Sequence, residues 1–384
     1  MNNNKPEKPS RRKFLYNLSL AGISLPLISS GSNCRNSDKP KPKRMTVKDK
    51  KAGKLGIALV GLGSYSGGQL APALQQTEHC YLAGIVTGTP AKIPVWKEKY
   101  GLADKNIYNY DNYDEIKDNP DIDIIYIVLP NSLHAEYAIR AAKAGKHVIC
   151  EKPMAISVAE CDKMIAASKE AGKMLSIGYR LHYDPYNLEM ARLGKEKVYG
   201  EIKKMNAEFS FIAQKGIWRL DKKLAGGGPL MDLGIYCLQG VMYTTGMEPV
   251  AVTAQSPLVT DTEKFLGVEE TLSFQMEMPN GLIAECRTSY SENANFLRAE
   301  AERGWFELKP AYSYSGLKGI TSNGKIMEYP NLSQQAKQMD AFCLSVKNNQ
   351  PSVVPGEMGR RDLKIIEAIY EAMRTGRRVE IVKN

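Results

Sequence analysis

From residue 55 onward, short apolar runs rich in β-branched residues alternate with longer segments of helical periodicity. Such runs predict buried strands, which we expect at 55–60, 81–86, 123–129, 147–150 and 174–177. Ser132 and Ser157 stand where helices would begin, and Gly145 and Gly172 stand where they would end. Strands that alternate with helices form a parallel sheet covered on both faces, so the pattern predicts a doubly wound α/β domain over residues 55–182.

A different pattern precedes this domain. Ser10-Arg11-Arg12-Lys13-Phe14-Leu15 is followed by an apolar stretch to residue 28 and then by small polar residues. This order is typical of a twin-arginine export signal, which we expect over residues 1–34 and which predicts a periplasmic protein that uses the twin-arginine export machinery. The alternative is an internal or membrane-anchoring helix, but the stretch is shorter than the roughly 20 apolar residues that span a bilayer.

The segment after the signal sets two further expectations. Cys34 leaves a lipid anchor open, although Gly31-Ser32-Asn33 before it is a poor lipidation motif. Residues 35–54 are rich in Lys and Pro, which predicts an extended arm without a core of its own. Such an arm could pack on a partner subunit.

The charge and the metal-binding residue types exclude several classes of function. The chain of 384 residues has a net charge of +10, but residues 1–54 hold 14 Lys and Arg against 3 Asp and Glu, which leaves the rest at about −1. A nearly neutral body argues against nucleic-acid binding. The seven cysteines contain no C-x-x-C pair, and the four histidines are not at zinc spacing. We therefore expect buried thiols and no metal.

The first strand leads directly into Gly61-Leu62-Gly63-Ser64-Tyr65-Ser66. Two glycines at this spacing, between a strand and a helix, allow a tight turn and a close approach of the backbone to a pyrophosphate. The alternative is a glycine turn with only a structural role. The second strand ends in Thr87-Gly88-Thr89 and then Lys92, with no Asp or Glu to hold ribose hydroxyls. A cation and hydroxyls suit a 2′-phosphate, so NADP is favoured over NAD, unless Lys92 is only a solvated helix residue.

Ligands of open parallel sheets collect beyond the carboxyl ends of the strands. Two such ends carry polar residues: Leu129-Pro130-Asn131-Ser132-Leu133-His134 and Cys150-Glu151-Lys152-Pro153. In a cleft Lys152 would lose hydration, which would lower its pKa and suit it to proton transfer. The alternative is a surface lysine in a loop.

A second group of residues occupies 226–236, where three glycines and Pro229 predict a helix start with room for a ligand near its exposed amides. Asp232 and Tyr236 are four positions apart and share one helical face. A carboxylate and a phenol can orient a sugar hydroxyl and exchange its proton. The alternative is a capping Asp beside a packed Tyr.

Taken together, Gly61-x-Gly63, Glu151-Lys152-Pro153 and Asp232-x-x-x-Tyr236 resemble the Gfo/Idh/MocA oxidoreductase family, and within it the glucose-fructose oxidoreductase branch. The likeness extends over most of residues 55–383. It implies an N-terminal Rossmann domain and a C-terminal α+β domain, 183–384, with a large open mixed sheet. Expected strands of that sheet lie at 202–211, 250–258, 270–278 and 282–289. The open face implies a homo-oligomer, dimer or tetramer.

The resemblance also implies roles for individual residues. Lys152 would lie beside the reacting carbon, Asp232 would orient the sugar, and Tyr236 would donate and accept the proton. A tyrosine at position 236, where many relatives have His, indicates the sugar-oxidising branch that uses NADP. The residues expected to bind the sugar are Lys152, Arg180, His182, Asp232 and Tyr236. The residues expected to bind the cofactor are Gly61, Gly63, Ser64, Tyr65, Thr87, Gly88, Thr89, Lys92, Tyr110, Leu129, Pro130, Asn131, His134, Glu151, Lys152, Arg180, Trp218, Arg219 and Tyr314.

The implied reaction joins two half-reactions. An exported enzyme would find little free NADP, so we expect a tightly held cofactor that one aldose reduces and a keto-sugar or another carbonyl acceptor reoxidises. Glucose and fructose are the pair that the resemblance implies, with a lactone as the first product. The alternatives are an NAD(P)-dependent glycosidase on the same fold, a simple NADP-dependent sugar dehydrogenase, and a sugar-binding sensor without catalysis.

Overall fold

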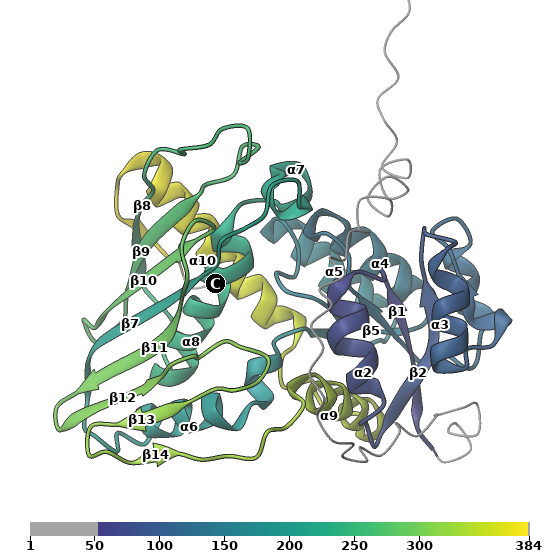
Figure 1. Cartoon of the computed structure of the whole chain (residues 1–384), viewed down its shortest axis with the longest axis horizontal. Helices are drawn as coiled ribbons and strands as arrows, with labels where there is room; N and C mark the ends of the chain where they lie inside the picture. Colours follow the sequence, from purple (N-terminus) through teal and green to yellow (C-terminus); the bar gives the residue numbers. More distant parts are fainter. Residues whose placement is uncertain (1–52, 383–384) are drawn as a thin grey trace, which may run out of the picture.

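The computed structural model describes residues 53–382, which form two units, each built on one β-sheet (Figure 1). The export signal expected at 1–34, Cys34 and nearly all of the arm expected at 35–54 lie outside the described residues. No helix within residues 53–382 is both long enough and apolar enough to cross a bilayer. Six cysteines fall in this part of the chain, and each is a buried free thiol.

The first unit contains a six-stranded, fully parallel sheet in the order β3-β2-β1-β4-β5-β6. Its strands are β1 (Leu55–Val60), β2 (Cys80–Val86), β3 (Ile107–Tyr108), β4 (Ile124–Ile127), β5 (His147–Cys150) and β6 (Leu175–Ile177). Its main helices are α2 (Ala71–Leu74), α3 (Lys92–Tyr100), α4 (His134–Lys143) and α5 (Val158–Glu170). The predicted doubly wound sheet is confirmed, and β3 is an additional edge strand. The order of strands reverses between β1 and β4, which is where such sheets bind ligands.

The predicted helix ends differ in how well they match. Ser157 caps α5 by accepting a hydrogen bond from the Glu160 N–H at 3.3 Å, and Gly172 follows this helix with a φ of 62°. Ser132 does not cap α4, because Asn131–Leu133 form a separate helical turn before it. The helix α4 therefore begins later than the sequence pattern predicts, at His134.

The second unit has a nine-stranded sheet in the order β14-β13-β12-β11-β7-β10-β9-β8-β15. Its strands are β7 (Ile202–Ser210), β8 (Ala251–Gln255), β9 (Thr271–Glu277), β10 (Ile283–Ser289), β11 (Ala294–Ala301), β12 (Gly304–Leu308), β13 (Gly319–Thr321), β14 (Ile326–Met327) and β15 (Val379–Glu380). The sheet is mixed, because β7 and β10 are parallel and the other pairs are antiparallel. The predicted α/β fold class is thus confirmed for both sheets.

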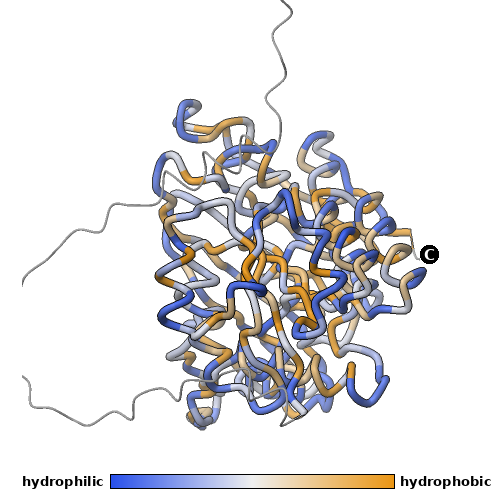
Figure 2. The backbone as a smooth tube through the Cα atoms, turned by 90° about the vertical axis from the view of Figure 1, so that its right-hand side faces the viewer, coloured by the Kyte–Doolittle hydropathy of each residue, from blue (hydrophilic) through white to orange (hydrophobic). Residues whose placement is uncertain are grey.

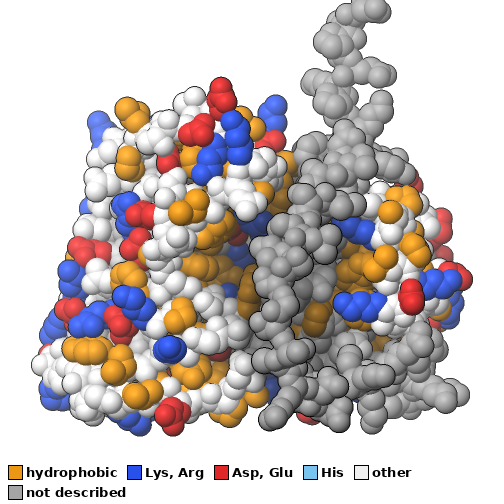
Figure 3. Space-filling view, in the orientation of Figure 1, with side chains coloured by type: hydrophobic (Ala, Val, Ile, Leu, Met, Phe, Trp, Pro, Cys, Tyr) orange, Lys and Arg blue, Asp and Glu red, His pale blue; other side chains and the backbone are white. Residues whose placement is uncertain are grey.

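Helices cover one face of this large sheet. They are α6 (Pro185–Lys195), α8 (Ile235–Thr245) and α10 (Gly356–Thr375), and within the described residues the opposite face carries no helix (Figure 1). Side chains from Lys204 to Glu208 on β7 alternate between more exposed and buried positions, as expected for a sheet with one packed face. The strands that run through the interior are the most hydrophobic parts of the backbone (Figure 2). On the surface shown in Figure 3, basic and acidic side chains are interspersed.

Two helices from the second half of the sequence pack on the first unit. One is α10, which packs against α5 and β6. The other is α9 (Gln334–Asn348), whose Met339 and Phe342 share a buried cluster with Leu70 and Leu74. The Asp340 carboxylate on α9 accepts hydrogen bonds from the backbone N–H groups that lead into β2, at 2.8 and 3.0 Å. The chain therefore returns to the first unit after forming the large sheet.

Candidate active site

The loop after β1 has a backbone shape that requires glycine at one position and leaves open space at another. Gly61 has a φ of +91°, and a Cβ there would lie 2.5 Å from the Val128 carbonyl oxygen. A Cβ on Gly63 would meet nothing within 4 Å. The Ser66 hydroxyl donates to the Gly61 carbonyl at 2.5 Å. The loop is thus fixed on its inner side and free on its outer side, where Ser64 is exposed.

The residues at the end of β2 lie against this loop. Lys92 donates from Nζ to the Leu62 carbonyl at 2.8 Å, and burial lowers the pKa of this lysine. The Thr87 hydroxyl accepts a hydrogen bond from the Thr89 N–H at 3.1 Å. Gly88 between them is buried. These groups form a polar corner beside the glycine loop, without a carboxylate among residues 86–92.

The loop after β4 is braced by side chains that the sequence assigned to the cofactor. His134 is fully buried, with Nδ1 2.8 Å from the Pro153 carbonyl and Nε2 2.9 Å from the Leu129 carbonyl. Burial lowers the pKa of His134, against the opposing effect of these carbonyls. The Asn131 amide donates to the Ala225 carbonyl of the second unit at 2.8 Å. Both side chains are thus engaged with protein, and they fix the two strand-end loops.

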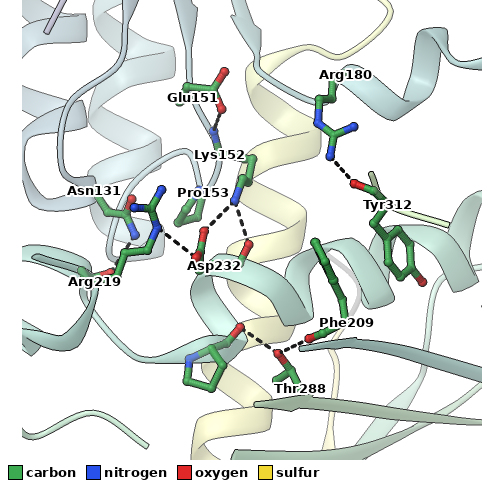
Figure 4. Close-up of polar contacts among 12 residues, drawn as sticks. Asn131, Glu151, Lys152, Pro153, Arg180, Phe209, Arg219, Asp232, Thr288 and Tyr312 are labelled. Carbon is green, nitrogen blue, oxygen red and sulfur yellow. Dashed lines mark hydrogen bonds and ion pairs between the residues drawn. The ribbon is translucent and has the colours of Figure 1, made fainter. Parts of the chain in front are cut away.

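Lys152 and Asp232 meet between the two units (Figure 4), and the Tyr236 ring lies beside Lys152. Lys152 follows β5 and is 12% exposed. Its Nζ donates to Asp232 Oδ1 at 2.9 Å and to the Asp232 carbonyl at 2.7 Å, and it lies 4.7 Å from the centroid of the Tyr236 ring. Asp232 lies in η8 (Leu230–Gly234), and Tyr236 is in the first turn of α8.

Asp232 is surrounded by donors. Its Oδ2 accepts hydrogen bonds from Arg219 Nε at 3.0 Å and from the Tyr290 hydroxyl at 3.1 Å. Burial alone would raise the pKa of Asp232, but Lys152 and Arg219 outweigh it and hold this pKa well below its usual range. Burial lowers the pKa of Lys152, but the Asp232 carboxylate reverses that effect and leaves it above its ordinary value. The predicted lowering of the Lys152 pKa is therefore wrong, because its counter-charge comes from the other unit.

The three glycines at 226–228 do not leave room for a ligand, and that expectation is wrong as well. Glu269 occupies the amides, because its carboxylate accepts hydrogen bonds from the Gly228 N–H at 2.9 Å and the Leu230 N–H at 3.1 Å. A Cβ on Gly227 would lie 2.0 Å from the Tyr370 hydroxyl. The glycines allow close packing around a buried carboxylate, which fixes the start of the helix that carries Asp232.

Arg180 forms the opposite wall of the site. Its guanidinium carbon lies 4.5 Å from the ring centroid of Tyr314 and 5.2 Å from that of Tyr236. The side chain donates to the carbonyls of Tyr312 and Ser313 and to the Gln334 amide oxygen (Figure 4 shows the Tyr312 contact). Its Nε is buried and has no hydrogen-bond partner within the described residues. Arg180 is therefore held in place mainly by backbone carbonyls and Gln334.

The remaining predicted residues lie at differing distances from this centre. Glu151 accepts a hydrogen bond from the Tyr126 hydroxyl at 2.7 Å, and burial raises the pKa of this carboxyl. Tyr65 lies beside Tyr314, with ring centroids 5.7 Å apart. Trp218 stacks with Arg219 at 4.6 Å. Tyr110 instead packs against Tyr137, and Leu129 and Pro130 are buried in the loop after β4.

Sequence reasoning missed three residues that shape the site. The Tyr290 hydroxyl donates a hydrogen bond to Asp232, and the Glu269 carboxylate accepts one from the Gly228 N–H. The Gln334 amide oxygen accepts one from Arg180. Each lies far along the chain from its partner and belongs to no motif. For Glu269 the available signal was a pair of acidic residues, Glu269-Glu270, just before the predicted strand.

The parallel sheet, the glycine loop and the charged cluster at the strand ends define a dinucleotide-dependent oxidoreductase of two domains. Residues 55–179 match the oxidoreductase family with an NAD-binding Rossmann fold, and residues 187–307 match the GFO/IDH/MocA C-terminal domain. The chain belongs to the Gfo/Idh/MocA oxidoreductase family.

Named relatives and solved structures agree with this assignment. The chain is 41% identical to an aldose-aldose oxidoreductase from Caulobacter crescentus, crystallised with glycerol, with a TM-score of 0.82 over 85% of this chain and 99% of that one. It is 25% identical over 333 residues to the NADP-dependent D-xylose 1-dehydrogenase of Haloarcula marismortui, covering 83% of this chain and 91% of the relative. It is also 26% identical over 356 residues to the D-glucoside 3-dehydrogenase of Escherichia coli, covering 85% and 97%.

The residues present fit the nicotinamide dinucleotide that this family implies. The outer side of the Gly63 position is open, and a larger residue at Gly61 would collide with the next strand end. Thr87 and Lys92 supply a hydroxyl and a cation beside this loop, and such groups suit a ribose or a phosphate. In residues 53–382 no group of three or more His, Cys, Asp or Glu side chains is placed to hold a metal ion.

Proposed function

We propose that this chain is an exported aldose oxidoreductase that retains NADP and recycles it between two sugars. The coarser class, an NAD(P)-dependent sugar oxidoreductase, follows from the family and from the named relatives. The observation that carries the finer proposal is the buried cluster of Lys152, Asp232 and Tyr236 at the carboxyl ends of the parallel strands. The relative at 41% identity is named for transfer between two aldoses, which supports a second sugar as the acceptor.

In the first half-reaction Lys152 acts as a charged donor. Asp232 keeps its ammonium group protonated and fixed, so it can donate a hydrogen bond to the sugar oxygen that loses its proton. Its charge then stabilises the negative charge that develops on that oxygen. Tyr236, as a phenolate, takes the proton and becomes a neutral phenol. A bound NADP would supply a hydride acceptor for the sugar carbon and, once reduced, a hydride donor for the carbonyl carbon of the second sugar.

In the second half-reaction the same groups act in reverse. Tyr236 returns the proton to the carbonyl oxygen of the second sugar while Lys152 holds that oxygen, as microscopic reversibility requires. Arg180 and Tyr314 would line the nicotinamide side of the pocket, and Thr87 and Lys92 would favour the 2′-phosphate of NADP over NAD. The acceptor is a second aldose or a ketose such as fructose.

The experiment follows the near-ultraviolet absorbance of nicotinamide in the purified full chain. We expect an added aldose to reduce the bound cofactor and a second sugar, an aldose or a ketose, to reoxidise it without release. If the cofactor is removed by gel filtration and turnover needs external NADP, the chain is a simple dehydrogenase. If neither sugar changes the absorbance but a glycoside is cleaved, the chain is a glycosidase.

The proposal extends to location and assembly. The Arg11-Arg12 leader supports export to the periplasm, with a lipid anchor at Cys34 as the alternative to a free protein. The helix-free face of the large sheet supports a homo-oligomer. Fractionation of cells and light scattering of the purified chain test these two points.

A further inference from the structure

A series of hydrogen bonds connects a small, mainly apolar cavity beside Lys152 and Tyr236 to a buried carboxylate. His182 lies in η6 (Arg180–Tyr183), Gln239 lies in α8, and Asp362 lies in α10. His182 Nε2 is 2.6 Å from the Gln239 amide oxygen, and the Gln239 amide nitrogen donates to Asp362 Oδ2. Three elements that are distant in sequence therefore meet at one glutamine.

Asp362 determines which group donates and which group accepts in each of these hydrogen bonds. It is fully buried, and its Oδ1 accepts two hydrogen bonds from Arg361, at 2.8 and 3.0 Å. A carboxylate paired in this way only accepts, so the Gln239 group that faces it must be the amide nitrogen. The Gln239 oxygen then faces His182, and an oxygen only accepts. The hydrogen must therefore be on His182 Nε2.

The second ring nitrogen of His182, Nδ1, is left as a hydrogen-bond acceptor. Burial lowers the pKa of His182, against the opposing effects of Gln239 and Asp362, which favours the neutral ring. A neutral ring with its hydrogen on Nε2 has a bare Nδ1 that can only accept. Within residues 53–382 this Nδ1 has no hydrogen bond. His182 lines the same cavity as Lys152, Tyr236 and Gln239.

We propose that Gln239 and Asp362 hold His182 as the Nε2–H tautomer, so that Nδ1 accepts a hydrogen bond from one hydroxyl of the sugar. This makes His182 a specificity-determining residue for a hydroxyl group, and Gln239 and Asp362 positioning residues. The inference rests on the proposed function for the identity of the ligand. The tautomer itself is independent of any reaction.

The tautomer is measured by nitrogen-15 NMR of the full chain labelled at histidine. The chain has four histidines, so one variant, His182→Gln, assigns the signal. We expect a protonated Nε2 and an unprotonated Nδ1 at neutral pH, and a mixture of tautomers in Gln239→Met. Gln338→Met, at a buried glutamine that bonds Tyr126 on the other unit, is the matched control and should leave the His182 signal unchanged. A wild-type Nδ1–H tautomer or a charged ring would overturn the proposal.

The role in specificity is measured with a series of monodeoxy sugars. We expect one deoxy position to lower kcat/KM by about 10-fold in the wild type, the cost of one hydrogen bond. His182→Gln keeps a donor near Nε2 and lacks the acceptor, so this penalty should vanish. His182→Asn places an amide oxygen near Nδ1 and should retain part of it. A penalty that persists in His182→Gln would refute the role, whereas a wild type without any sugar turnover would refute the proposed function instead.

Discussion

Replacing Asp232 with Asn removes one negative charge from between two cations without changing the size of the side chain. Asp232 accepts hydrogen bonds from Lys152 at 2.9 Å, Arg219 at 3.0 Å and Tyr290 at 3.1 Å, and its side chain is 15% exposed. Breaking a buried ion pair by removing one partner costs about 3–5 kcal/mol. We therefore expect the free energy of unfolding to fall by about this amount.

The matched control is Asp114→Asn, the same chemical change in a surface ion pair. Asp114 bonds Arg140 at 2.9 Å but is 68% exposed, so water screens the pair. We expect its loss to cost about 0–1 kcal/mol. Both variants are unfolded in urea, and the three tryptophans of the chain report the transition.

The difference between wild type and Asp232→Asn should depend on pH in a defined direction. The folded pKa of Asp232 is lowered, so its contribution is present above the unfolded carboxyl pKa of about 3.9 and is lost as the pH falls further. The folded pKa of Lys152 is raised, so its contribution is present below the unfolded value of about 10.4 and is lost as the pH rises through the folded value. The difference should thus be constant from about pH 5 to 9. A cost no larger than that of Asp114→Asn, or one that grows in acid, would refute this account of the cluster.

Three further variants test the site. Tyr236→Phe should slow both half-reactions by about 10²–10⁴-fold with nucleotide binding retained, whereas Tyr312→Phe, which removes a buried hydroxyl that makes no geometric hydrogen bond within residues 53–382, should leave the rates nearly unchanged in stopped-flow assays. Lys92→Ala should weaken NADP binding by about 10-fold or more, with little effect on NAD, in fluorescence titrations; equal losses for both nucleotides would contradict a 2′-phosphate contact. Gly61→Ala should destabilise the chain by about 1–3 kcal/mol through backbone strain and abolish nucleotide binding, while Gly63→Ala, at an open position, should cost much less in the same unfolding measurement.

Local patterns in the sequence were enough to predict five strands of the first sheet and its glycine loop, but not the two-residue edge strand β3. Strands such as β2 and β4 are continuous apolar runs, because a parallel sheet with helices on both faces buries the side chains of its central strands. The second sheet is harder to predict, because β11 to β14 have one packed face and several are very short. The helix-free face of that sheet followed only from resemblance.

The sequence predicted that Lys152, Asp232 and Tyr236 share one site, and the structure brings them together, but their electrostatics were not predicted. Lys152 was expected from its place after a strand, yet the charge that sets its pKa comes from Asp232, 80 residues away. The amides after the three glycines were expected to face a ligand, and Glu269 fills them from 41 residues away. His134 was expected to contact the cofactor, and its two ring nitrogens face backbone carbonyls instead. Sequence periodicity identifies which residues reach a strand end, but it does not identify what packs against them.

The return of α9 to the dinucleotide-binding sheet limits how this enzyme can be divided. A fragment that ends at residue 182 would lack Met339 and Phe342, and it would expose Leu70 and Leu74 to water. Asp340 would also be missing from the amides that lead into β2. Since α10 also packs on α5 and β6, an autonomous nucleotide-binding fragment would need both the α9 and the α10 segments grafted back. Chimaeras with other members of the family should therefore exchange these segments together with the first unit.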